Sequence, residues 1–263
     1  METKHPVRQL FLIWLVSSIV LTVGSLLIDW FPTAASKGSH EIDTLYDVLL
    51  IVSVPIFTLV MTVAIYSVWR WRARPGDMGD GPPIHGNTRL EIAWVTVPTI
   101  MVLSLAAYGW IVLNDVEAKK PNELNVHVIA QQFTWHFQYP QYGNFTSDQL
   151  WLPKGRSVKF DVNTRDVIHS FWVPSFRLKT DTVPGLTTHI RVTPDRLGEY
   201  DVVCAELCGP GHSTMREFTH VVTPQAFQAW VAKERKAPAP GGVAPTGGGG
   251  GASASAANTI RAG

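Results

Sequence analysis

The sequence predicts a membrane-anchored protein: a pair of transmembrane helices, preceded by one further apolar segment, carrying an all-β external domain. Charged residues make up only 16% of the 263 residues, against roughly 25% in soluble domains. Three uncharged apolar stretches of about 20 residues are each long enough to cross a bilayer as a helix. The region after them alternates apolar and polar residues, which is typical of half-buried strands.

Proline interrupts two of the three apolar stretches, at Pro55 and Pro98. Transmembrane helices tolerate proline where neighbouring groups satisfy the freed backbone. Three charge-free runs in one short chain are hard to bury as core helices. We therefore expect the second and third to form a transmembrane hairpin over residues 37–116. The stretches cover residues 9–28, 48–69 and 92–113.

The first stretch fits either a retained helix or a secretory signal, within an N-terminal segment of residues 1–36. Lys4 and Arg8 precede it, and residues 32–36 (PTAAS) after it resemble a cleavage region. A secretory signal has an apolar core of roughly 7–15 residues, and this stretch is longer. Its length favours a retained helix.

The orientation follows from the basic residues between the second and third stretches. Arg70, Arg72 and Arg74 lie in this short loop. Because basic residues concentrate in short cytoplasmic loops, residues 70–91 are predicted inside and the chain from Asn114 onward outside. We expect a multi-pass protein of the plasma or inner membrane, with its external domain on the outer, periplasmic side.

Short alternating strands predict a β-sandwich or barrel over residues 117–236. Three strands are clear from the alternation, at residues 124–129, 157–162 and 189–192.

Two further segments follow the strands. A short amphipathic helix is predicted from residue 224 to about 236, with Phe227 and Trp230 three residues apart. Residues 237–263 are rich in Gly, Ala, Pro and Ser. Such a segment cannot bury enough apolar surface to fold, so we expect a disordered tail.

Composition excludes several function classes. The 22 Lys+Arg residues nearly balance the 21 Asp+Glu residues, for a net charge of +1, which argues against a nucleic-acid binder. Two cysteines are too few for a disulfide-rich scaffold, a four-thiolate zinc site or an iron–sulfur cluster. The sequence has no C-x-x-C-H motif, which excludes a covalent c-type haem.

Both cysteines lie in one short loop that also holds a histidine and a methionine. Cys204 is followed by Cys208, His212 and Met215, and His169 lies upstream between predicted strands. Thiolate, thioether and imidazole ligands together select copper. A mononuclear blue-copper site needs two His, one Cys and a weak Met. The extra thiolate is what a second copper would need, with both sulfurs bridging the ions.

Two simpler interpretations of the loop explain less. A disulfide between Cys204 and Cys208 leaves the nearby His212 and Met215 unexplained. A zinc ion held by two cysteines and two histidines leaves Met215 without a role. The spacing of three residues between the cysteines is also not that of a usual zinc finger.

Residues 40–233 resemble subunit II of haem–copper cytochrome c oxidases, and the cysteine loop is similar to the binuclear CuA motif of that family. The other matching segments are 91–98 (EIAWVTVP), 166–174 (DVIHSFWVP) and 178–185 (LKTDTVPG). The resemblance implies a cupredoxin-like β-barrel that holds two copper ions. The implied copper ligands are His169, Cys204, Cys208, His212, Met215 and the backbone carbonyl of Glu206.

The resemblance also implies the electron-accepting subunit of a proton-pumping terminal oxidase. Electrons from cytochrome c, or a similar one-electron donor, would pass through the copper pair to haem in catalytic subunit I, where oxygen is reduced to water. This chain would hold no haem and no oxygen-reducing site, and other oxidase subunits would be further partners. Quinol-fed relatives lack the copper ligands, and nitrous-oxide reductase needs a large additional catalytic domain. A membrane-anchored cupredoxin acting alone is the remaining alternative.

Three further roles are implied by the resemblance. The Glu206 carboxylate would help to hold a magnesium ion shared with the catalytic subunit; the alternative is a solvated loop carboxylate. Glu91 would mark the entrance of a proton path, or simply lie at the membrane boundary. The family commonly has Trp-x-Trp near the copper, the first Trp receiving the electron, whereas this chain has Phe133 and Trp135. Either Phe133 takes that role, the electron arrives elsewhere, or both rings belong to the strand core.

Overall fold

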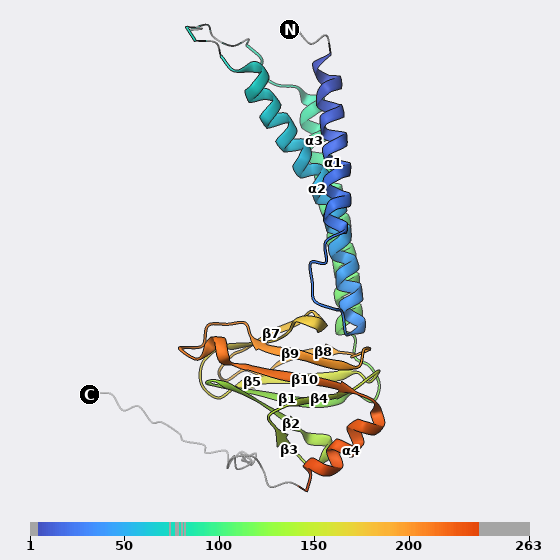
Figure 1. The fold of residues 1–263 in the computed structure, drawn as a ribbon. Coiled ribbons are helices and arrows are strands. Elements are labelled where there is room, and N and C mark those ends of the chain that lie inside the picture. Colours follow the sequence, from blue (N-terminus) through green and yellow to red (C-terminus); the bar gives the residue numbers. More distant parts are fainter. Residues whose placement is uncertain (1–4, 74, 77–78, 80, 82, 237–263) are drawn as a thin grey trace, which may run out of the picture.

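The computed structural model describes residues 5–73, 75–76, 79, 81 and 83–236. Three long helices extend away from one side of a β-domain (Figure 1). They are α1 (Pro6–Leu26), α2 (Lys37–Trp71) and α3 (Thr88–Glu117). All three are long and apolar enough to cross a membrane, which confirms the predicted hairpin and adds a third candidate span. The predicted tail, residues 237–263, lies outside the described residues.

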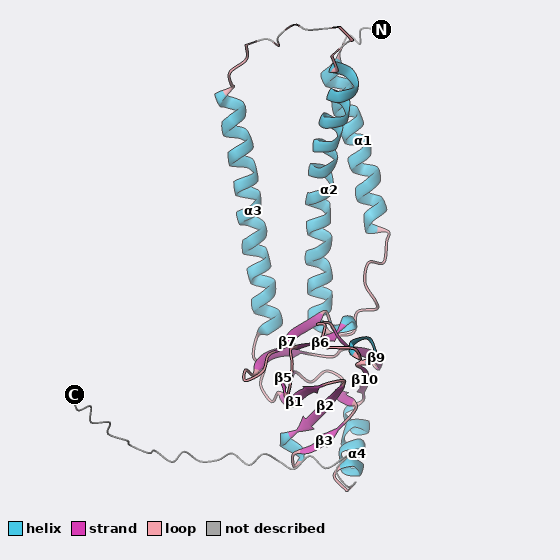
Figure 2. Cartoon of the chain, turned by 90° about the vertical axis from the view of Figure 1, so that its left-hand side faces the viewer, coloured by secondary structure: helices cyan, strands magenta, loops and turns pink. Residues whose placement is uncertain are grey.

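Helix α2 is much longer than its apolar stretch. It has 35 residues, or about 52 Å at 1.5 Å per residue, whereas the hydrocarbon core of a bilayer is about 30 Å thick. It begins at Lys37 because the Ser36 side chain accepts a hydrogen bond from the Ser39 N–H, in a capping box. The helix continues through Pro55. Its first turns therefore extend beyond the membrane to meet the β-domain (Figure 2).

The β-domain consists of two five-stranded sheets, which is the predicted all-β architecture in the form of a sandwich. One sheet has the order β3-β2-β1-β5-β8 and the other β4-β10-β9-β6-β7. The strands of the first sheet are β1 (Leu124–Gln131), β2 (Thr134–Tyr139), β3 (Phe145–Ser147), β5 (Val158–Thr164) and β8 (Thr188–Val192). Those of the second are β4 (Leu150–Pro153), β6 (His169–Val173), β7 (Leu178–Thr182), β9 (Gly198–Cys204) and β10 (Arg216–Val222).

The core lies between the sheets and is rich in aromatic rings. Every second residue of β1 is buried, as its alternation predicted. Phe171 on β6 contacts Trp135, Phe137 and Phe160, all on the facing sheet. These rings are fully buried, so β6 rests on a closely packed layer.

Helix α4 (Pro224–Glu234) follows β10 and packs against β4. Short 3-10 turns at Pro140–Tyr142 (η1), Pro174–Phe176 (η2) and His212–Thr214 (η3) connect strands. As its spacing predicted, Phe227 and Trp230 are buried. Trp230 stacks on Trp151 with ring centroids 5.3 Å apart and packs against Tyr139.

Candidate metal centre

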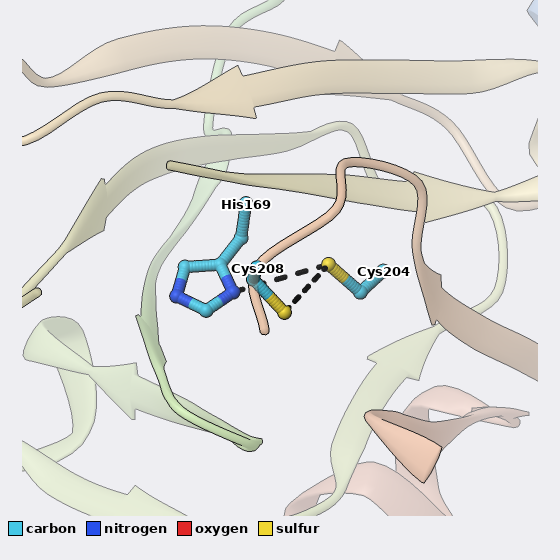
Figure 3. Close-up of side chains that lie close together, drawn as sticks. All are labelled: His169, Cys204 and Cys208. Atoms are coloured by element: carbon cyan, nitrogen blue, oxygen red, sulfur yellow. Dashed lines mark hydrogen bonds between the residues drawn. The ribbon is translucent and has the colours of Figure 1, made fainter. Parts of the chain in front are cut away.

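The six predicted copper ligands come together at one end of the sandwich, on or beside neighbouring strands of one sheet. His169 begins β6, and Cys204 ends β9, which pairs with β6 in the sheet. The loop after β9 then returns Cys208, His212 and Met215 to the same place before β10 begins. Figure 3 shows His169 and the two cysteines directed toward one another.

The sulfur atoms form the middle of the site and the other donors surround them. The Sγ atoms of Cys204 and Cys208 lie 3.9 Å apart, and both cysteines are free. A disulfide needs about 2.05 Å between sulfurs. Since a metal–thiolate bond is about 2.3 Å for zinc, a soft ion between sulfurs at this spacing can bond to both. The spacing suits two bridging thiolates.

Each cysteine sulfur lies near a different histidine ring, so the donor atoms divide into two groups. The Nδ1 atom of His169 lies 3.9 Å from Sγ of Cys204, and Nδ1 of His212 lies 3.7 Å from Sγ of Cys208. The Glu206 carbonyl oxygen is 3.2 Å from the first sulfur, and the Met215 thioether is 3.9 Å from the second. Two thiolates, two imidazoles, a thioether and a carbonyl therefore fit a pair of copper ions.

The site is enclosed on its inner side. His169 and Met215 are fully buried and both cysteines are buried, whereas Glu206 is exposed. Burial raises the pKa of the Cys208 thiol to about 11, and the adjacent Cys204 adds to the rise. Without metal this cysteine is therefore protonated at neutral pH, and a bound cation must displace its proton.

Asp166 holds the buried histidine in position. Its Oδ1 atom lies 2.9 Å from Nε2 of His169, which leaves Nδ1 facing the sulfurs. Burial alone would raise the pKa of Asp166, but hydrogen bonds from the Gln132 N–H, His169, the Val167 N–H and Thr164 lower it to about 2. A carboxylate on the outer nitrogen of a metal-binding histidine fixes its tautomer and orientation. In the sequence this role is signalled by an acidic residue three positions before a candidate ligand histidine.

Gln132 fastens the cysteine loop to the first sheet. Its side-chain Nε2 donates to the Cys208 carbonyl at 2.6 Å, and its backbone N–H donates to Asp166 at 2.7 Å. One residue thus joins the loop to the carboxylate that orients His169. Its role was not predicted, because the partners lie far away in the sequence.

The two aromatic candidates occupy different environments. Phe133 is half-buried and lies over the cysteine loop: a Cβ added to Gly211 would come within 2.5 Å of its ring. Glycine is therefore required there for close approach. Trp135 is fully buried and meets the His169 ring edge-on, with centroids 6.2 Å apart. Phe133 is the one near the surface.

Glu91 is remote from the metal centre. It lies in the first turn of α3, at the end of the helices away from the β-domain (Figure 2). Its side chain is exposed, and Oε1 accepts a hydrogen bond from the Asn87 N–H at 3.1 Å. The carboxylate therefore also caps the start of α3.

Sequence comparisons place both halves of the chain in one family. Residues 22–112 match the model of the cytochrome c oxidase subunit II transmembrane domain, and residues 145–222 match that of the periplasmic domain. Cytochrome c oxidase subunit 2 of Synechocystis is 32% identical, covering 86% of this chain and 83% of the relative. The corresponding protein of Alkalihalophilus pseudofirmus is 34% identical, covering 76% of this chain and 61% of the relative.

A solved structure of the same kind also matches. The periplasmic domain of subunit II of cytochrome oxidase from Bradyrhizobium japonicum has 26% sequence identity and a TM-score of 0.43, covering 45% of this chain and 96% of that one. The sequence matches extend over both the membrane helices and the metal-bearing domain. From the family-model matches and the similarity to its curated relatives, the chain belongs to the cytochrome c oxidase subunit II family.

Proposed function

We propose that this chain is the electron-accepting subunit of its oxidase: it holds two copper ions, takes electrons from cytochrome c and delivers them to haem in the catalytic subunit. The observation that carries the proposal is the paired donor set, in which two sulfurs 3.9 Å apart each have an imidazole within 4 Å. Copper bound there would supply one-electron transfer. The ligands are His169, Cys204, Cys208, His212, Met215 and the Glu206 carbonyl.

The surrounding residues suit electron transfer because they restrict movement of the ligands. His169 and Cys204 are fixed by adjacent strands of one sheet. Gln132 and Phe133 hold the cysteine loop from the facing sheet. A site that keeps its geometry when its charge changes needs little reorganisation. The six donors also fill the site, so we assign oxygen reduction to the catalytic subunit and no haem to this chain.

The surface beside the ligands supports docking of a donor through apolar contacts. Val167 and Ile168, which precede His169, and Leu207, which precedes Cys208, are exposed by 39%, 46% and 78%. Phe133, in the turn between β1 and β2, packs over Gly209 and Gly211 of the cysteine loop. We assign it as the residue through which electrons arrive, with Trp135 against His169. An apolar docking face makes association only weakly dependent on salt.

Two carboxylates are assigned roles in the assembled oxidase, one in magnesium binding and one in proton uptake. The exposed side chain of Glu206 is free to help hold a magnesium ion shared with the catalytic subunit, while its carbonyl faces Cys204. Glu91, exposed at the inner end of α3, is assigned to the entrance of a proton path. These roles require a plasma or inner membrane with the copper domain on its outer side.

The decisive experiment is spectroscopy of the full chain after loading with copper. We expect two coppers per chain, a near-infrared absorption band, and an electron paramagnetic resonance spectrum of one electron shared by both ions. A spectrum of a single, isolated copper would overturn the dinuclear assignment. Haem should co-purify with the chain from its native membrane. Its absence would favour a membrane-anchored cupredoxin that acts alone.

A further inference from the structure

We propose that residues 6–36 stay in the mature protein, as a third transmembrane helix followed by a strap that fixes the external domain on α2. The strap is the segment 30–36, between α1 and α2. The alternative is that α1 is a secretory signal, removed at the small residues that follow it. The contacts of the strap and of α1 distinguish retention of this segment from its removal.

The end of the strap is built into the β-domain. Ala35 is fully buried; its N–H donates to the Ser175 carbonyl at 2.9 Å, and its own carbonyl accepts from the Asp195 N–H at 3.1 Å. Ser36 is also fully buried and bridges Pro194. These residues behave as a short strand on the edge of the domain. A chain that began at Ser36 would lack both hydrogen bonds of Ala35 and its place in the core.

Arg177 links the strap to α2 and to the β-domain. Its guanidinium bonds both carboxylate oxygens of Asp43 on α2, at 2.7 and 2.8 Å, and donates to the Pro174 carbonyl of the β-domain. The same group donates to the Pro32 carbonyl at 2.9 Å and lies 4.7 Å from the centre of the Phe31 ring. Only 8% of this side chain is exposed. Removing the strap would uncover a buried cation and take away two of its contacts.

The strap also packs against the part of α2 outside the membrane. The rings of Trp30 and Phe31 both meet Tyr46 edge-on, with centroids 6.4 and 4.9 Å apart. The three rings form a small aromatic cluster beside Arg177. Residues 30–32 and 35–36 are therefore engaged with α2 or with the β-domain.

Helix α1 is held on α2 by specific polar contacts as well as by apolar packing. The hydroxyls of Ser18 and Thr58 are 2.6 Å apart and buried between the helices. The Trp14 indole donates to the Pro55 carbonyl at 2.9 Å, and the Tyr66 hydroxyl donates to Gln9. Hydrogen bonds of this kind hold helices together in lipid, where hydrophobic attraction between helices is absent. A helix destined for removal needs no such matched partners.

The peptide bonds whose preceding residues fit signal cleavage lie at the end of the strap or in the first turn of α2. Cleavage sites have small residues at the first and third positions before the cut bond. Between residues 27 and 40 this pattern precedes the bonds after Ala35, Ser36 and Gly38. The first joins two fully buried residues, the second follows the N-cap of α2, and the third lies within α2. Each cut would remove contacts on which the folded domain relies.

The first test is the intact mass of the chain purified from its native membrane. We expect a mass that includes residues 6–36. A mature chain that begins at Ser36, Lys37 or Ser39 would overturn the proposal. The measurement needs no variant, so it decides the retention of α1 even if changes to the strap prevent folding.

The second test is hydrogen exchange at the amides of Ala35 and Lys37, which donate to carbonyls of the β-domain. We expect both amides to be protected in the full chain. Arg177→Lys and Phe31→Ala should speed their exchange at least tenfold, because each removes a contact of the strap. Leu27→Ala, at an 80% exposed position outside the strap, is the matched control and should change nothing. Exchange in the wild type at the rate of an unstructured peptide, or no change in both variants, would disprove the strap.

Discussion

The Asp166 carboxylate lies 2.9 Å from the outer nitrogen of His169, and this contact decides which nitrogen faces the cysteines. The same carboxylate accepts the Gln132 N–H, so one acidic side chain orders a ligand and the residue that fastens the cysteine loop. Neither contact involves the metal directly. Both bear on how well the site is formed before copper arrives.

We expect Asp166→Ala to lower copper affinity by about 10–100-fold, the usual effect of losing a carboxylate behind a ligand histidine. Asp166→Asn should retain more affinity, because an amide oxygen can still accept from Nε2. Competition with a copper chelator measures both. Asp148→Ala removes a similar contact at His136, 2.9 Å away, and serves as the control. Equal affinities in all variants would show that the sheet alone positions His169.

Cys204→Ser and Cys208→Ser should each abolish the dinuclear site, since each sulfur is proposed to bridge both ions. Metal analysis should find at most one copper per chain, with a changed spectrum. Met215→Leu is the milder comparison: the thioether is a weak ligand, so two coppers should remain and the redox potential should shift. Two coppers and an unaltered spectrum in either serine variant would contradict the assignment.

Phe133→Ala should slow reduction of the copper by its donor while leaving copper content unchanged. The ring covers the cysteine loop near the exposed Leu207, so its loss opens a gap in the path. Stopped-flow reduction at several salt concentrations is the measurement, with a shallow salt dependence expected. Phe218→Ala, at a 45% exposed position on β10, is the control. Unchanged rates would move the assignment to Trp135, and a steep salt dependence would indicate a charged docking face.

Glu91→Gln should slow turnover of the assembled oxidase while leaving the copper spectrum intact. Glutamine keeps an oxygen to accept the Asn87 N–H, so the cap of α3 survives and the charge alone is lost. Oxygen consumption across pH is the readout. The Asn87 side-chain oxygen also accepts the Leu90 N–H at the start of α3. Asn87→Ala removes that bond but keeps the Glu91 carboxylate, so it separates helix stability from proton uptake. Turnover equal to wild type at every pH would exclude Glu91 from the proton path.

Asp161→Asn should reduce thermal stability at neutral pH and have no effect in acid. Burial would raise the pKa of Asp161, but hydrogen bonds and positive charge from Lys159 and His189 outweigh this effect, so the pKa lies below its ordinary value. The Nε2 atom of His127 lies 3.6 Å from the second carboxylate oxygen. A lowered folded pKa gives stability that is present above the unfolded value of about 3.9 and disappears as pH falls through the folded value. Unfolding midpoints of the full chain at pH 7 and at about pH 2 test this. A difference that persists at the lower pH would mean that packing, not charge, is involved.

The proposed ligands could be recognised as candidates in the sequence because their spacing is local: four of the side chains come from one short segment. The residues that support it could not, since Gln132 reaches Cys208 across 76 positions. The helical structure of residues 37–47, before the apolar stretch, could not be predicted for a different reason. Residues 37–47 are polar enough to look like a loop, and the helix there is supported by Arg177, which pairs with Asp43 from 134 positions away. Hydropathy detects the lipid-facing part of a helix and misses the part that a folded domain stabilises.

The unbroken course of α2 from the membrane into the domain has a geometric consequence. A helix turns about 100° and rises about 1.5 Å with each residue. One residue inserted among 37–47 would rotate the metal centre by about 100°, a little more than a quarter turn about the helix axis, away from the surface it faces on its partner. Insertions of seven residues, close to two full turns, would nearly restore the direction while raising the domain by about 10 Å. The length of this stalk is therefore constrained residue by residue, independently of the contacts that Asp43 and Tyr46 make along it.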